Sequence, residues 1–357
     1  MICSVSCGSP RPDLDASQVD VATPPSDGGA DLDARSDVVR LDAPRPADVP
    51  AVDAPAADVP WVRDWHAFPA IVQIARPDTV YAVSDVHGGY ARLTVLLAIH
   101  GLIASVPASP ALARWSAGAA VLTVVGDLVD KGPQGLEVVD LLRALQPGAI
   151  AAGGAVVVTL GNHEAEFLAD PLNSKATAAN GVDTELTAMG LDPATVASAT
   201  DARGQWLRSL PFAVRVGGWF FAHAGDTQGR DLAALESALH DAVALQDYGA
   251  AEVIGTGSIL ESRDWYLSDP TRPMRYALAV GASHLVMGHD PHALGPDGVI
   301  SRTADAALFR IDCGMSPDVD YSAGVLLRVR RVGANDVAES LEADGTVAPV
   351  WTGPAAR

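Results

Sequence analysis

Lysine is almost absent from this sequence, since Lys131 and Lys175 stand alone among 357 residues. The 24 lysines and arginines face 44 acidic residues, and the formal net charge is −20. Nucleic acids and anionic membranes attract basic surfaces, so this charge argues against both as partners. The sequence also has no stretch near the roughly 20 consecutive apolar residues of a membrane span.

Cysteine is equally scarce, with three residues in the chain. Cys3 and Cys7 lie near the N-terminus, whereas Cys313 lies in an apolar run. Three cysteines do not make a disulfide framework, and we predict a buried free thiol at Cys313. The length and the apolar fraction of 48% suit one large or two average globular domains.

Residues 1–64 are dominated by Asp, Ala, Pro, Val and Ser, which predicts a disordered, acidic tether. The opening Ser-Val-Ser-Cys7-Gly-Ser resembles the cleavage region of a bacterial lipoprotein, but the preceding signal regions are missing. One interpretation is that Met1 is internal to a longer precursor, with the protein in the cell envelope or periplasm on an N-terminal lipid anchor. The alternative is a cytoplasmic protein with a disordered tail.

From residue 65 onward the pattern is that of a globular domain. Apolar, β-branched runs predict strands, and several of them are separated by stretches with helical periodicity. The expected strands cover 79–86, 120–128, 155–160, 219–222, 284–287, 308–311 and 324–330, and the expected helices cover 91–100 and 135–145. This alternation predicts a βαβ-built α/β core over residues 65–331.

Two further segments complete the expected domain organisation. Between residues 164 and 212 the strand signal lapses, and the composition predicts a helical insertion. Its length favours a substrate-shaping cap over an ordinary helical crossover. Residues 332–357 have the pattern of a weak strand or a loose tail, and we expect a C-terminal tail there.

Six short clusters carry Asp, His and Asn, mostly at the ends of the apolar runs. They are Ser-Asp85-Val-His87-Gly-Gly, Gly-Asp127-Leu-Val-Asp130-Lys131-Gly, Gly-Asn162-His163-Glu164, Phe-Ala-His223-Ala-Gly225, Met-Gly-His289-Asp290 and Ile-Asp312-Cys-Gly-Met. Functional groups in βαβ-built sheets collect in the loops beyond the carboxyl ends of the strands. One such residue alone is usually a capping, surface or core residue, but the ordered set predicts the active site of a two-metal phosphoesterase.

The first clusters suit metal ligation. Asp85 and His87 lie two residues apart, so their side chains project the same way from an extended chain. Oxygen together with imidazole suits Mn, Fe or Zn better than Mg or Ca. The carboxylate of Asp127 can bridge two metals, and its alternative role is an N-cap for the helix that follows.

The later clusters divide between ligands and an acid. Asn162 and His163 are adjacent and cannot easily bind one metal with the same projection. We therefore expect Asn162 to be a ligand and His163 to be an acid that Asp130 orients. His223 and His289 each end an apolar run, and beside the matched clusters they are predicted to be ligands.

Together, Asp-x-His-Gly, Gly-Asp-x-Val-Asp-(Arg/Lys)-Gly, Gly-Asn-His-Glu, His-Ala-Gly and Gly-His resemble the calcineurin-like metallophosphoesterases, within the phosphoprotein phosphatase branch. The ending Phe-Arg-Ile-Asp312-Cys-Gly-Met-Ser316 is most similar to the Shewanella-like protein phosphatases. The resemblance covers residues 76–331 and implies a four-layer α/β/β/α sandwich with two ions of Mn, Fe or Zn. The implied ligands are Asp85, His87 and the bridging Asp127 for the first ion, and Asn162, His223 and His289 for the second.

The resemblance also implies a mechanism. A hydroxide that bridges the ions would attack phosphorus in line, and His163, oriented by Asp130, would protonate the leaving group. Asn162, Lys131 and Arg263 are the candidate phosphate-binding residues. Lys131 stands where the family usually has Arg, and a lysine cannot grip phosphate bidentately.

His292 stands where this branch commonly has Gln. It could reach the first metal, line the pocket or lie on a loop. Substrate choice is expected to be decided near Lys131, Arg263 and His292.

Three functions are compatible with these motifs. The leading one is a metal-dependent phosphatase that acts on phosphorylated proteins or small phosphoesters, and we expect it to be a monomer. A dinucleoside polyphosphate hydrolase is the second, because Gly-Asp-Leu-Val-x-x-Gly-Pro followed by Leu-Glu-Val-Val-x-Leu-Leu is very similar to that relative. The third, an inactive envelope binding module, is disfavoured because a dead copy would tolerate loss of its ligand clusters.

Overall fold

The structure is a computed structural model that describes residues 61–355. Apart from residues 61–64, the predicted tether lies outside the described residues. Among those described, every helix is too short or too polar to span a lipid bilayer. The predicted α/β architecture is confirmed, because two six-stranded sheets form the centre of the domain.

Each sheet combines strands from distant parts of the sequence. The first has the order β1 (Ile71–Ile74), β5 (Ala213–Val216), β6 (Trp219–Ala222), β7 (His284–Met287), β9 (Leu308–Arg310) and β8 (Ser301–Arg302). The second has the order β12 (Val347–Pro354), β11 (Asn335–Glu342), β10 (Val325–Val332), β2 (Thr79–Val83), β3 (Val121–Val125) and β4 (Ala155–Thr159). β2, β3 and β4 run parallel, as do β6, β7 and β9, so the carboxyl ends within each set lie together.

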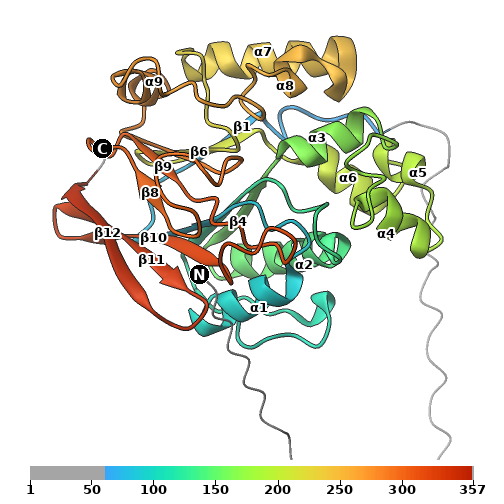
Figure 1. The fold of residues 1–357 in the computed structure, drawn as a ribbon, viewed down its shortest axis with the longest axis horizontal. Helices are drawn as coiled ribbons and strands as arrows, with labels where there is room; N and C mark the ends of the chain where they lie inside the picture. The colour runs from blue at the N-terminus through green and yellow to red at the C-terminus, as the bar shows by residue number, and fades with distance from the viewer. Residues whose placement is uncertain (1–60, 356–357) are drawn as a thin grey trace, which may run out of the picture. The chain divides into compact units, whose positions relative to one another are not determined.

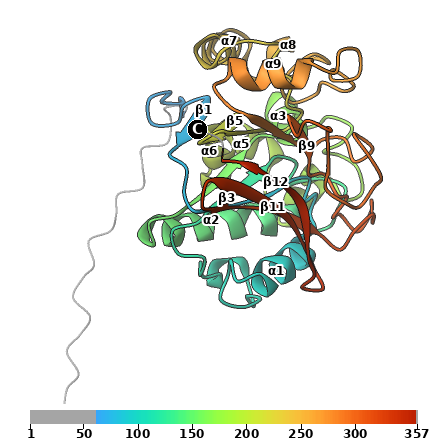
Figure 2. The same ribbon diagram turned by 90° about the vertical axis from the view of Figure 1, so that its left-hand side faces the viewer.

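Helices cover the outer face of each sheet, and Figures 1 and 2 show the resulting four layers. On the second sheet lie α1 (Tyr90–Ile99) and α2 (Gly135–Ala151). On the first lie α7 (Leu232–Gln246), α8 (Ala251–Ile254) and α9 (Arg272–Ala279). The α/β/β/α sandwich expected from the resemblance is therefore present.

Strand β3 shows why the sheets need cover on both faces. All five of its residues are buried. Val121 and Val125 belong to the core that contains residues of both sheets, whereas Leu122 and Val124 belong to the core shared with the helices. Side chains alternate along a strand, so a continuous apolar run is the expected pattern for a strand covered on both sides.

The predicted helical insertion contains four short helices. They are α3 (Asn162–Ala169), α4 (Val182–Ala188), α5 (Pro193–Ala197) and α6 (Ala202–Ser209). In Figure 1 they gather on one side of the sheets, and α3 follows directly from β4. We call residues 164–212 the insertion from here on.

The C-terminal segment corrects the expectation of a tail over residues 332–357. β11 pairs antiparallel with both β10 and β12, so the second sheet extends to Pro354. Trp219 of the first sheet donates a hydrogen bond from Nε1 to Asp336 Oδ2 at 3.0 Å, and both residues are fully buried. β12 is half-exposed along its length, which explains why its sequence carries a weak apolar signal.

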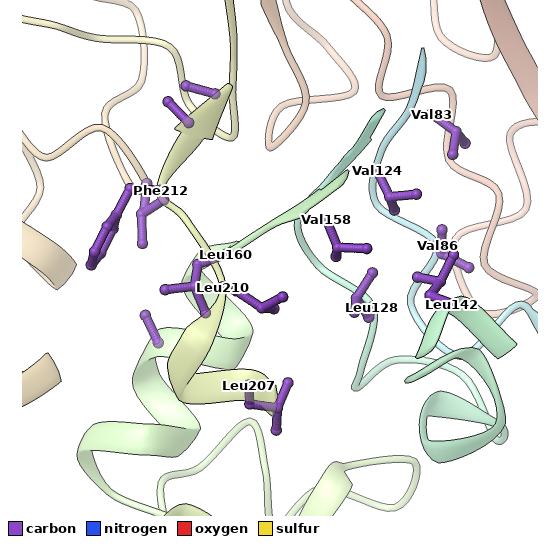
Figure 3. Packing of buried hydrophobic residues seen from close by; sticks show 14 of the residues in the cluster. Val83, Val86, Val124, Leu128, Leu142, Val158, Leu160, Leu207, Leu210 and Phe212 are labelled. Atoms are coloured by element: carbon purple, nitrogen blue, oxygen red, sulfur yellow. The ribbon is translucent and has the colours of Figure 1, made fainter. Parts of the chain in front are cut away.

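The core beneath α2 supplies a test of packing. Leu142 is fully buried, and Figure 3 shows it among Val86, Val124 and Val158. We expect Leu142→Ala to lower the free energy of unfolding by about 2–5 kcal/mol, because the lost contacts leave a cavity. Urea unfolding followed by circular dichroism measures this change. Ile150→Ala on the same helix is the control, since Ile150 is 70% exposed, and an equal loss there would contradict the assignment.

Candidate active site

Loops at the carboxyl ends of the parallel strands bring the predicted site residues together. All of the proposed metal ligands and the proposed acid are buried. Asp85 and His87 follow β2, Asp127 follows β3, Asn162 and His163 follow β4, His223 follows β6, His289 follows β7, and Asp312 follows β9.

Several of these residues have left-handed backbone conformations. The φ angles are 50° at Asp85, 43° at His87, 54° at Asp127 and 66° at His289. Asp and His tolerate this region better than most residues other than glycine. The sharp turns end the strands and direct neighbouring side chains toward one centre. Gly126 has φ of 72°, and a Cβ there would lie 2.5 Å from the Gly161 backbone, so the loops after β3 and β4 touch.

Backbone carbonyls fix the orientation of two imidazoles. His87 Nδ1 donates to Val129 O and His223 Nδ1 donates to Val125 O, each at 2.9 Å. A carbonyl can only accept, so in the neutral rings Nε2 carries the lone pair, as a metal ligand requires. Both Nε2 atoms face Asp127, at 3.3 Å for His87 and 3.2 Å for His223.

The carboxylate of Asp127 is the electrostatic centre of the site. Burial acts to raise its pKa, but His223, His163 and His87 together hold that pKa well below its ordinary value. Burial acts to lower the pKa of His223, but Asp127 outweighs it and raises that pKa to about 10. His223 Nε2 also lies 3.0 Å from Asn162 Oδ1. Because Nδ1 already donates to Val125 O, both ring nitrogens of His223 face oxygen acceptors, and a second proton or a metal ion at Nε2 satisfies this arrangement.

Two groups of donor atoms fit metal ions. One comprises His87, Asp127 and His163, the other comprises Asp127, His223 and His289, and within each group the atoms lie within 4.8 Å of one another. Both groups contain Asp127, which agrees with its expected bridging position. The mixture of imidazole and carboxylate donors suits Mn, Fe or Zn.

Asp85 lies beside the first group. Its Oδ1 is 4.0 Å from His87 Nε2, and its carboxylate accepts the backbone N–H of His289. Burial, with the nearby Asp312 and Asp127 carboxylates, raises the pKa of Asp85 well above its ordinary value. A proton or a nearby cation relieves such repulsion between buried carboxylates, so the position of Asp85 is compatible with the role of a ligand.

His163 and Asp130 form a close pair on the wall of the site. His163 Nδ1 donates to Asp130 Oδ2 at 2.6 Å, and His163 Nε2 lies 3.8 Å from Asp127 Oδ2. Asp130 therefore holds the ring with Nε2 turned toward the proposed metal ligands. This is the geometry expected of a proton donor and the residue that orients it.

Glu164 has a structural role that the sequence motif did not reveal. Its fully buried carboxylate accepts hydrogen bonds from the backbone N–H groups of Asp127, Leu128, Val129 and Gly161, at 2.7–3.2 Å. One side chain thus joins the loop after β3 to the loop after β4. A Glu at the third position of a helix is the pattern of a capping box. This pattern in the sequence could have identified Glu164 as a structural residue.

Glu164→Gln tests this connection. An amide has one acceptor oxygen, and its NH₂ group would face N–H donors. We expect a loss on the order of 3 kcal/mol in the free energy of unfolding, because several buried donors lose a charged acceptor. Thermal and urea unfolding measure the effect. Glu137→Gln, on the partly exposed face of α2, is the matched control and should change stability little.

A pocket of about 540 Å³ opens beside the proposed ligands. Both lysines of the chain, Lys131 and Lys175, line it together with Arg263. Lys131 Nζ lies 2.9 Å from His87 Nε2, and half-exposed Arg263 donates to His289 O at 3.1 Å. The predicted phosphate-binding cations are therefore at the pocket, and Lys175 is a lining residue that the sequence did not single out.

His292 and Cys313 lie apart from this chemistry. The exposed His292 ring contacts Asp297 Oδ1 through Nδ1 at 2.9 Å and lies on a loop, the last of the three alternatives for it. The predicted buried free thiol at Cys313 is confirmed. Burial raises the pKa of that thiol to about 12, so it is not poised as a nucleophile.

Residues 79–298 match the family model of the calcineurin-like phosphoesterases. The chain belongs to that family. A calcineurin-like phosphoesterase is a metal-using hydrolase, and the two donor groups around Asp127 could hold metal ions. The superfamily predicted from the ordered motifs is therefore confirmed.

Curated relatives match parts of this phosphoesterase. Shewanella-like protein phosphatase 2 of Arabidopsis thaliana is 33% identical over 89 residues, which are 25% of this chain and 21% of that protein. The symmetrical bis(5'-nucleosyl)-tetraphosphatase of Methylococcus capsulatus is 32% identical over 146 residues, 41% of this chain and 42% of the relative. The matched part of the chain thus spans less than half the length of either relative.

A solved structure shares the fold of this phosphoesterase. The cold-active protein-tyrosine phosphatase of a Shewanella species has a TM-score of 0.60 at 20% identity, and the match covers 78% of this chain and 82% of that one. The likeness supports the four-layer sandwich. The Arabidopsis relative, by its name, agrees with the branch expected from the motifs.

Proposed function

We propose that this phosphoesterase hydrolyses phosphomonoesters of proteins or small molecules. The observation that supports this most directly is the His163–Asp130 pair, which lines the same pocket as Asp127, Lys131 and Arg263. A proton donor, candidate phosphate-binding cations and the shared carboxylate of two donor groups thus face one space. That combination suits cleavage of a P–O bond with protonation of the leaving oxygen.

The residues fit two ions of Mn, Fe or Zn. In our proposal Asp85, His87 and Asp127 would hold the first, and Asp127, Asn162, His223 and His289 would hold the second. When bound, the two ions would lower the pKa of water and offset charge on the phosphoryl oxygens.

Side chains of the protein would bind the phosphoryl group and protonate the leaving oxygen. Lys131, Arg263 and the amide of Asn162 would bind phosphoryl oxygens. His163, protonated on both nitrogens, would donate the Nε2 proton to the leaving oxygen, while Nδ1 would keep its proton in the hydrogen bond to Asp130. Electrostatic positioning of this kind acts strongly in a buried site.

The insertion is proposed to act as a cap that shapes the substrate. Ala178 and Ala179 of the insertion, with Val319, give the pocket apolar walls that suit an aryl or alkyl leaving group. Lys175 adds little positive charge, since its Nζ lies 2.8 Å from Glu166 Oε1 and 3.8 Å from Glu261 Oε1. A pocket with apolar walls and little added positive charge suits a phosphomonoester better than a polyanionic nucleotide.

A dinucleoside polyphosphate hydrolase remains the second candidate, because the Methylococcus relative is 32% identical over its matched stretch. Phosphate release with Mn²⁺ from a phosphotyrosine peptide, a phosphoserine peptide and a dinucleoside tetraphosphate separates the two functions. We expect the peptides to be preferred. A higher kcat/KM for the nucleotide would favour the second candidate, and no Mn²⁺-stimulated hydrolysis of any substrate would favour an inactive binding module.

A further inference from the structure

Helix α4 of the insertion contacts the loop after β3 at two separate points. This loop, residues 130–136, carries Asp130 and Lys131 and ends in the first turn of α2. One contact is on Asp130 itself, and the other is on the first turn of α2. α4 therefore holds the loop at both ends.

The first contact holds Asp130, the residue that orients the proposed acid His163. Asp130 Oδ1 accepts the backbone N–H of Val182 at 2.8 Å, while Asp130 Oδ2 accepts from His163 Nδ1 at 2.6 Å. All three residues are buried. Each carboxylate oxygen thus has one partner, and the orientation of the imidazole depends on where α4 places the Val182 N–H.

The second contact is made by Glu185, one turn along α4. Its carboxylate accepts the backbone N–H of Gly135 at 2.8 Å and that of Leu136 at 3.0 Å. The first N–H groups of a helix have no partner within it, and a negative charge is favourable there. Glu185 therefore fixes the start of α2 against α4.

The position of α4 is itself determined by packing. Val182 and Leu186 are buried in the main hydrophobic core, and Asp183 N donates to Ala176 O at 3.0 Å. At Gly181 a Cβ would lie 2.0 Å from Ala176 O, so the chain approaches itself closely just before the helix. With α4 held in this way, its two contacts can restrain the loop.

We infer that Glu185 is a positioning residue for proton donation. By fixing α2 and the 130–136 loop against α4, it keeps Asp130 between Val182 N and His163, and thereby directs His163 Nε2 toward the leaving oxygen. The inference rests on the proposed acid role of His163. It assigns to the insertion a part in catalysis in addition to shaping the pocket.

Glu185→Ala tests the inference with two substrates. Hydrolysis of a phosphoserine peptide, whose alkoxide leaving group needs a proton, should fall about 10-fold or more in kcat. Hydrolysis of p-nitrophenyl phosphate, whose leaving group needs little help, should fall less than about 3-fold. The downfield ¹H NMR resonance of the His163 Nδ1 proton, assigned by its loss in His163→Asn, should shift or broaden.

Matched variants separate positioning from general damage. Asp183→Asn removes one carboxylate from the same helix and should leave both rates unchanged. Glu185→Gln keeps one acceptor and should fall between wild type and Glu185→Ala, which maintains the test if the alanine variant folds poorly. An equal loss on both substrates, or no loss on either, would overturn the inference.

The His163→Asn variant separates the proposed acid role of His163 from the positioning role of Glu185. If its loss is the same for both substrates, the proposed acid role fails and this inference fails with it. If its loss depends on the leaving group but that of Glu185→Ala does not, only the positioning role of Glu185 is wrong.

Discussion

Asp127→Asn is expected to reduce Mn²⁺-dependent hydrolysis of an aryl phosphate by about 10³-fold or more. Asp127 is common to both donor groups and faces His87 and His223 through its two oxygens. An amide is neutral and presents only one acceptor oxygen, so both proposed ions would lose a charged ligand. Metal ions contribute several kcal/mol of transition-state stabilisation, and each 1.36 kcal/mol is a factor of ten in rate.

The measurement that decides this prediction is metal content together with rate. Equilibrium dialysis against Mn²⁺, followed by elemental analysis, should show fewer ions per chain in Asp127→Asn than in the wild type. Asp336→Asn is the control, because Asp336 is also fully buried but is bonded to Trp219 and Arg76 away from the site. It should lower the melting temperature and retain its metal. Normal metal content and a normal rate in Asp127→Asn would show that Asp127 does not bridge.

His163→Asn is expected to give the second large effect, with a different signature. General acid catalysis contributes about 10²–10⁴-fold, so hydrolysis of a phosphoserine peptide should fall by that factor. Hydrolysis of p-nitrophenyl phosphate should fall much less, because nitrophenolate leaves without a proton. Replacing His163 breaks the 2.6 Å hydrogen bond to Asp130 and leaves the other imidazoles in place.

A series of aryl and alkyl phosphates provides the measurement for His163. The logarithm of kcat should depend more steeply on the pKa of the leaving group in His163→Asn than in the wild type. Metal content should stay near the wild-type value if His163 acts as an acid. If metal is lost in parallel with activity, His163 is instead a ligand, which is the alternative suggested by its place in the group with His87 and Asp127.

The sequence predicted the parts of the fold that have a strong local signal. All seven expected strands are present, because buried strands are continuous apolar runs. The expected helix over residues 135–145 continues to Ala151 although Pro147 lies within it, so packing on the sheet outweighs the lost hydrogen bond. β11 and β12 were expected to be a tail, since half-exposed strands at a sheet edge have little apolar alternation.

The candidate site was predictable for a similar reason. Loops after adjacent parallel strands meet at one sheet edge, so Asp85, Asp127 and Asn162 had to lie close together once the strands were correct. Contacts from outside these loops were not predictable. The hydrogen bond from Val182 N–H to Asp130 and the ion pair between Glu166 and Lys175 depend on how the insertion folds back. No local sequence pattern predicts that fold.

The left-handed backbone at the site restricts how this enzyme can be redesigned. Asp130 and Lys131, at φ of 63° and 58°, share that conformation with Asp85 and Asp127. β-Branched residues are genuine outliers there, so Val, Ile or Thr at these positions would disturb the loops whatever their chemistry. A library aimed at new substrates should therefore offer Asn, Asp, His and Gly at such positions. Loss of activity in its β-branched members would report on backbone geometry as well as on the lost side chain.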